Sequence, residues 1–153
     1  MKTPLLRAGI FAAVLLVLIA VNISIVGKER IKTTGELVLL ELAPVDPRSL
    51  MQGDYMALRF TLAESLQAAQ AGRVAVQLDT HGVATLAESP PLNALRLRYR
   101  LRNGQVWLGT NAYFFEEGSA RRYEAARYGE FRVDRDSGEA VLVGLRDREF
   151  QAL

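Results

Sequence analysis

Cysteine is absent from this 153-residue chain, lysine is absent after Lys32, and histidine occurs only once, as His81. Without cysteine the chain has no disulfide, no thiol nucleophile and no cysteine-based metal site. A histidine-based catalytic triad would depend wholly on His81, whose place beside Gly82 in an expected turn favours an exposed loop residue. These absences remove most of the usual catalytic groups, and we expect neither a cofactor nor a metal ion.

Positive charge is concentrated at the N-terminus. Five lysines and arginines against one glutamate give the first 32 residues a net charge of +4, so the remainder carries −2 of the overall +2. A concentrated positive face is needed to bind nucleic acid, and a slightly acidic remainder does not favour one. We therefore expect no nucleic-acid partner.

Residues 9–27 form the one long apolar run and contain no charged side chain. As a helix rising 1.5 Å per residue, this run would reach about 28 Å, close to the hydrocarbon thickness of a bilayer. We expect an uncleaved single-pass membrane anchor. A cleaved signal peptide is the alternative, although its apolar core is normally shorter and ends in small residues at a cleavage site. A buried core helix is disfavoured because the run has no polar face.

The charges on the two sides of this run do not decide its orientation, since Lys2 and Arg7 precede it and Lys28, Arg30 and Lys32 follow it. A very short N-terminal tail before an apolar run is typical of a signal-anchor, which would place the rest of the chain outside the cytoplasm. The expected organisation is a tail (1–8), a transmembrane signal-anchor (9–27), a juxtamembrane linker (28–35) and one folded domain (36–153).

Alternating apolar residues predict a series of short strands in the domain. The clearest is 95–102, where leucines and Tyr99 alternate with four arginines. The pair Asn103-Gly104 then predicts a type I′ turn and a returning strand at 105–108. Further strands are expected at 36–42, 54–60, 73–80, 83–87, 131–134 and 140–145, and a buried strand at 113–115.

Two short helices are expected between these strands. Thr61 and Glu64 have capping-box spacing, with Gly72 as the stop, and Ser119 can cap a helix through about Arg127. The regular helices of a parallel βαβ sheet are missing. The predicted fold is therefore mostly β (α+β): a single N-terminal transmembrane helix followed by a small antiparallel sheet or partial barrel with two short helices.

Residues 53–60 read Gly-Asp-Tyr-Met-Ala-Leu-Arg-Phe, a run that resembles the signature of the GDYXXLXY family, with Phe60 in place of its final tyrosine. Segments 44–50, 113–118, 128–129 and 142–145 also look like that family, so the resemblance covers nearly all of the expected exported region. It implies a bacterial protein anchored in the inner membrane, with its domain in the periplasm or otherwise outside the cytoplasm. It supplies no reaction. The resemblance also implies that the protein accompanies a polytopic membrane protein, and by this association alone we expect an integral membrane partner.

The signature and a later acidic loop supply the candidate site. In a structural interpretation, Gly53 permits an unusual backbone conformation while Asp54 accepts backbone amides beneath Tyr55. In a functional interpretation, the two aspartates join the acidic loop in a pocket for a cation or a basic partner, although the regular carboxylate spacing of calcium sites is missing. The candidate residues are Asp46, Pro47, Gly53, Asp54, Tyr55, Leu58, Phe60, Glu116, Glu117 and Gly118.

Residues 50–54 also look like the Leu-x-x-Gly-Asp part of type I signal peptidases, which use a serine-lysine pair. The position six residues before Leu50, where those enzymes have the serine, is Pro44 in this chain, and no lysine follows Lys32. The catalytic pair is therefore missing.

The arginines of 95–102 form a stripe that could bind phosphate headgroups or an acidic partner. We favour the alternative of a solvated sheet face that pairs with acidic neighbours, and we expect two further aromatic residues in the core. The stripe is Arg96, Arg98, Arg100 and Arg102, the acidic neighbours are Glu130, Asp134 and Glu139, and the core aromatics are Tyr99 and Trp107.

The leading functional hypothesis is a non-enzymatic membrane-anchored domain that binds or stabilises an integral membrane protein. The alternative is an envelope hydrolase or a cation- or ligand-binding domain that uses the acidic pocket of Asp46, Asp54, Glu116 and Glu117.

Overall fold

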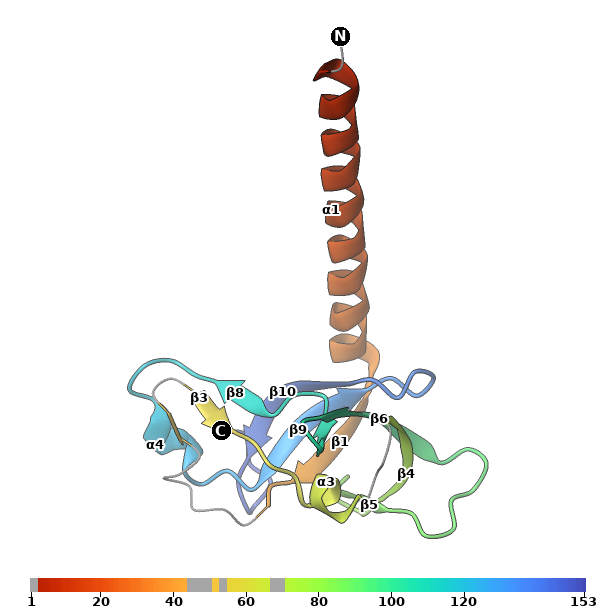
Figure 1. Cartoon of the computed structure of the whole chain (residues 1–153). Coiled ribbons are helices and arrows are strands. Elements are labelled where there is room, and N and C mark those ends of the chain that lie inside the picture. Colours follow the sequence, from red (N-terminus) through yellow and green to blue (C-terminus); the bar gives the residue numbers. More distant parts are fainter. Residues whose placement is uncertain (1–2, 44–50, 53–54, 67–70) are drawn as a thin grey trace.

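A single long helix stands out from a small β domain (Figure 1). The computed structural model describes residues 3–43, 51–52, 55–66 and 71–153. Helix α1 (Thr3–Thr34) has a mean hydropathy of 2.8 over its most apolar part, and none of that part is buried. Among the described residues it is the one helix long and apolar enough to cross a membrane. Because its apolar side chains are exposed, it is not a core helix of the domain.

The residues expected as a linker continue α1 to Thr34, and the helix meets the domain directly. Ile31 is buried against the domain, and the N–H of Gly35 donates to the Ile31 carbonyl at 2.8 Å. The Arg132 guanidinium donates to the Gly35 carbonyl, and Lys28 forms an ion pair with Glu139. These contacts attach the end of α1 to the sheet that follows.

The first sheet has the order β1-β9-β10 and is antiparallel. It consists of β1 (Glu36–Glu41), β9 (Tyr128–Val133) and β10 (Ala140–Arg146). Strand β1 is buried on both faces, since Val38, Leu39 and Leu40 are at most 2% exposed. The predicted first strand and the terminal hairpin are confirmed.

The second sheet has the order β5-β4-β6-β7 and is also antiparallel. It consists of β4 (Gly72–Leu78), β5 (Ala84–Leu86), β6 (Leu95–Arg102) and β7 (Gln105–Leu108). The predicted β6–β7 turn is confirmed, because Asn103 and Gly104 have φ values of 50° and 74°. His81 lies exposed in the β4–β5 connection, as expected, and stacks on Phe150.

The third sheet has the order β2-β3-β8 and contains part of the signature. Its strands are β2 (Met51–Gln52), β3 (Tyr55–Ala57) and β8 (Ala112–Phe114), all antiparallel. Together the sheets form a mostly antiparallel fold with a curled half-barrel, which confirms the predicted fold class.

Both domain helices are shorter than predicted. Helix α3 (Thr61–Ser65) has Phe60 at its N-cap without a side-chain cap, and it ends when Leu66 turns extended. The expected capping box and the stop at Gly72 are therefore wrong; Gly72 instead begins β4, where a Cβ would lie 3.0 Å from the Tyr99 hydroxyl. Helix α4 (Ala120–Tyr123) follows Ser119, whose hydroxyl donates to Glu116 rather than capping the helix. Packing and strand pairing outweigh the local helix signals.

Candidate functional site

The family-like signature ends in the core. Leu58 and Phe60 are each 1% exposed, and the Phe60 ring packs edge-on against Phe131 with centroids 5.4 Å apart. The Leu58 N–H donates to the Asn111 carbonyl, and the Arg59 carbonyl accepts from the N–H of Ala43. These hydrogen bonds join the strand to segments from two other parts of the chain, so Leu58 and Phe60 hold the sheets together.

Only part of the predicted acidic pocket lies within the described residues. Asp46, Pro47, Gly53 and Asp54 lie outside the described residues, so their convergence stays a prediction. Glu116, Glu117 and Gly118 form an exposed turn between β8 and α4, in which Gly118 has a φ of 82°. The described ranges contain no group of three His, Asp or Glu residues that could hold a metal ion.

Aromatic rings gather where the signature strand meets β8. Tyr55 lies beside Phe114 with ring centroids 5.7 Å apart, and Tyr123 of α4 lies 5.2 Å from both Tyr113 and Phe115. Burial and a hydrogen bond with Tyr123 raise the pKa of Tyr113. We call Phe114, Phe115 and Tyr123, with the adjoining Tyr55, the aromatic surface.

One ring of the aromatic surface is open to solvent, in contrast to the buried strand expected at 113–115, whereas Tyr55, Phe115 and Tyr123 are partly buried. The Phe114 side chain is 75% exposed, so that expectation is wrong for this residue. A hollow of about 460 Å³ lies over β8 and α4, and its lining includes Phe115, Glu116 and Arg122. Strand β8 occupies an edge of its sheet in the described part of the chain, and edge strands present unpaired backbone groups. An exposed ring therefore lies beside a strand that is at the sheet edge among the described residues.

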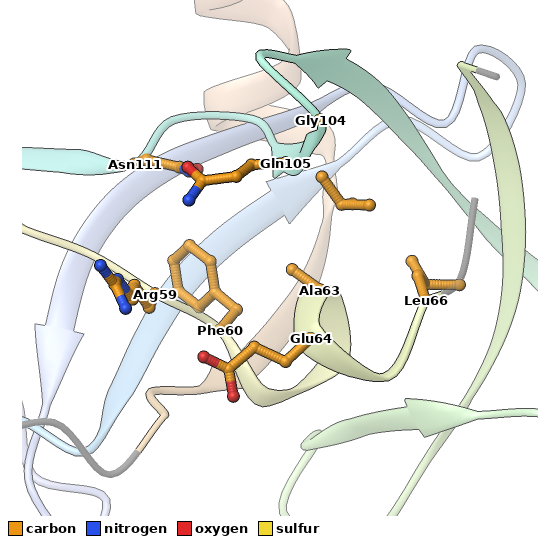
Figure 2. Close-up of a pocket in the computed structure, with 9 residues that line it drawn as sticks. Arg59, Phe60, Ala63, Glu64, Leu66, Gly104, Gln105 and Asn111 are labelled. Atoms are coloured by element: carbon orange, nitrogen blue, oxygen red, sulfur yellow. The ribbon is translucent and has the colours of Figure 1, made fainter. Parts of the chain in front are cut away.

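A second cavity of about 260 Å³ lies beside the end of the signature, at Arg59 and Phe60. Figure 2 shows its lining around the Phe60 ring, with Arg59 and Glu64 from one segment and Gln105 and Asn111 from others. The Oδ1 atom of Asn111 is buried and has no hydrogen-bond partner among the described residues. Such a group can be satisfied by a ligand or by water. No sequence signal singled out Gln105 or Asn111, because strand register and the turn after β7 bring them here.

The arginine stripe lies on the outer face of β6, as predicted, but its surroundings differ. Trp107 is the cross-strand neighbour of Arg100 and therefore lies on the arginine face, so its expected core position is wrong. Tyr99, opposite the buried Leu108, packs against the core as predicted. The Arg102 guanidinium lies 5.2 Å from the Trp107 ring centroid, within reach of a cation–π contact.

The acidic residues expected to pair with the stripe have other partners. Glu130 pairs with Arg146 at 2.7 Å, Glu139 with Lys28, and Asp134 accepts two hydrogen bonds from Ser137. The hydrogen bonds from Ser137 are the main reason why the pKa of Asp134 is lowered. None of the four stripe arginines forms an ion pair within the described ranges, and the favoured structural interpretation was wrong about these partners.

A family model described as GDYXXLXY protein matches residues 17–145 of the chain. The chain belongs to the GDYXXLXY family. A search of curated proteins found no match, and a search of solved structures found none either.

Two of the signature residues that the structure describes have a structural role in the core of the domain. The leucine and the final position of the signature are Leu58 and Phe60 here, and both are core residues. Since Phe60 replaces the family tyrosine, this chain buries a ring without a hydroxyl that would need a partner. Tyr55 differs from these two, because it faces the aromatic surface.

Proposed function

We propose that this GDYXXLXY family protein is a non-enzymatic accessory subunit, anchored by α1 in a bacterial inner membrane with its domain outside the cytoplasm. The domain binds an integral membrane protein through the aromatic surface. The observation that carries this proposal is the 75% exposure of Phe114 within a cluster of aromatic rings. Large exposed aromatic residues are enriched at protein interfaces and often dominate their binding energy.

The attachment of α1 supports a partner in the same membrane. The helix continues without a linker to Thr34, and Ile31, Lys28 and Gly35 fix its end against the domain. In Figure 1, β8 lies on the side of the domain nearer to α1, whereas α3 and β5 lie on the far side. A domain held in this way presents the aromatic surface at a restricted height above the bilayer. A partner in the same membrane is already held at a fixed height, so binding to it costs the two proteins less translational and rotational entropy.

Site-specific photo-crosslinking in native membranes tests the proposal. A photoreactive phenylalanine analogue replaces Phe114 in one variant and Leu92 in another, since Leu92 is a fully exposed apolar residue outside the aromatic surface. We expect position 114 to crosslink to one integral membrane protein and position 92 to give no such product. Equal labelling at both positions, or purification of the chain alone from several detergents, would contradict the proposal.

Ligand binding is a second candidate function, favoured by the cavity of Figure 2, which is lined by Asn111, a residue with an unpartnered Oδ1. A buried acceptor beside Arg59 and Glu64 suits a small polar ligand or a peptide end. The test is differential scanning fluorimetry of the full chain against amino acids, short peptides and sugars, with Asn111→Leu as the variant. A thermal shift that the variant loses would support binding, and a flat screen would exclude these ligand classes.

A further inference from the structure

We propose that a cationic pocket between the end of α1 and the β6–β7 hairpin binds the phosphate group of a phospholipid headgroup. The pocket has a volume of about 100 Å³ and is lined by Lys28, Arg98, Arg100, Trp107, Gly109, Glu139 and Ala140. That volume corresponds to roughly three water molecules, which suits a small anion.

The charge of the lining favours an anion. Three cations, Lys28, Arg98 and Arg100, surround the space, and Glu139 is the one carboxylate. Glu139 pairs with Lys28, so both guanidinium groups keep their charge unpaired within the described residues. Arg98 and Arg100 lie two positions apart on one face of β6, roughly 7 Å along the strand. Guanidinium groups bind phosphate oxygens through two parallel hydrogen bonds, and this spacing lets both approach one phosphate.

The indole of Trp107 gives a second, independent indication of a ligand. Its Nε1 is buried and has no hydrogen-bond partner in the described part of the chain. An unpaired buried donor costs about 1–3 kcal/mol, and a small movement of the ring would let an acceptor oxygen in the pocket it lines remove that cost. The Arg102 guanidinium over the ring helps to hold the indole in place.

Two glycines keep the pocket walls close together. Gly109 has a φ of 67°, and a Cβ there would lie 2.8 Å from the Ala140 carbonyl. A Cβ on Gly138 would lie 2.5 Å from the Arg96 carbonyl, and the Arg98 N–H donates to the Gly138 carbonyl at 2.7 Å. The β9–β10 turn is therefore bound to the backbone of β6, which fixes Glu139 beside the arginines.

The depth of the pocket identifies the source of the phosphate. Lys28 is the first charged residue after the apolar run 9–27, so it marks the end of the membrane-spanning part of α1. The headgroup layer extends about 5–8 Å beyond the hydrocarbon on each side of a bilayer. A pocket reached by the Lys28 side chain lies within that layer. Lipid phosphate groups are concentrated in that layer on either face of a bilayer, which favours a phospholipid over free phosphate.

The single tryptophan of the chain reports directly on this pocket. The full chain in nonionic micelles is titrated with short-chain phosphatidylglycerol, short-chain phosphatidylcholine and inorganic phosphate while Trp107 fluorescence is recorded. We expect a saturable change with phosphatidylglycerol that weakens at high salt, and a change at least tenfold weaker with inorganic phosphate. An equal response to inorganic phosphate would retain the phosphate site but overturn the lipid as its source. No saturable response to any of the three would overturn the proposal.

Variants that remove one charge each test whether the fluorescence change comes from lipid bound in this pocket. We expect Arg98→Gln and Arg100→Gln each to weaken binding about tenfold or more, because each removes a charge-assisted contact. Arg96→Gln is the matched control, since it removes the same charge from the same strand outside the pocket lining. Thermal melting without lipid shows which variants are folded, and Lys28→Gln replaces either arginine variant that is not. Equal weakening by Arg96→Gln would mean a diffuse charge effect and would overturn the site.

Discussion

Phe60 and Phe114 lie close to the same signature strand but have opposite surroundings. Phe60 ends the signature, is 1% exposed and packs on Phe131, whereas Phe114 pairs across from Tyr55 and is 75% exposed. Burial of the Phe60 ring explains its presence through stability alone. An exposed ring gains little from folding, so Phe114 calls for another explanation. The end of the signature, Leu58 and Phe60, is thus structural, and the candidate interface lies beside it.

The largest expected effect is on the buried member of this pair. Phe60→Ala should lower the free energy of unfolding by about 3–5 kcal/mol, because it leaves a cavity against Phe131. Phe114→Ala should change it by less than about 0.5 kcal/mol. Urea unfolding of the two full-length variants in the same detergent measures both values. Similar losses would show that Phe114 also supports the core.

A smaller stability effect is expected at the junction of the sheets. Gly109→Ala should cost about 1–3 kcal/mol, because a positive φ and a contact of 2.8 Å with the Ala140 carbonyl both oppose a Cβ. Gly104→Ala is the matched control, since it also has a positive φ but no atom within 4 Å of the added Cβ. The difference between the two midpoints of urea unfolding isolates the steric part. Equal midpoints would contradict close packing at Gly109.

Substitution of the exposed Phe114 should weaken partner binding without lowering the stability of the domain. Phe114→Ser should reduce co-purification of the membrane partner about tenfold, while leaving the melting temperature nearly unchanged. Leu92→Ser provides the control, because it removes an apolar side chain elsewhere that is even more exposed. Quantitative mass spectrometry of detergent eluates compares the two. If both variants retain the partner, the aromatic surface is not the interface.

The smallest effect is expected at Asp134, a partly exposed residue whose carboxylate accepts hydrogen bonds from Ser137 in the same turn. Hydrogen bonds from Ser137 lower the pKa of Asp134, so its stabilising contribution is present above the unfolded value near 3.9 and is lost as pH falls through the lower folded value. Asp134→Asn should therefore flatten the fall in unfolding free energy below about pH 4. Asp136→Asn, at an exposed position in the same turn, is the control. An unchanged acid dependence in Asp134→Asn would contradict this assignment.

The register of the β6–β7 hairpin shows both what could be predicted and what was missed. The alternation in 95–102 and the Asn103-Gly104 pair predicted both strands and their turn, because these features depend on neighbouring residues alone. A two-residue turn also fixes Arg100 opposite Trp107, so the sequence contained the signal that placed Trp107 on the arginine face. Judging Trp107 by its hydrophobicity instead of its register led to the wrong expectation.

The sequence by itself determined the long apolar helix, most strands and the family, because composition, alternation and turn chemistry act locally. Only the tertiary structure decided which surfaces remain open. Pairing of β3 with β8 exposes Phe114, and docking of the β9–β10 turn on β6 turns Lys28, Arg98 and Arg100 into one pocket. Both arrangements depend on contacts between segments distant in sequence, and no local pattern encodes such contacts.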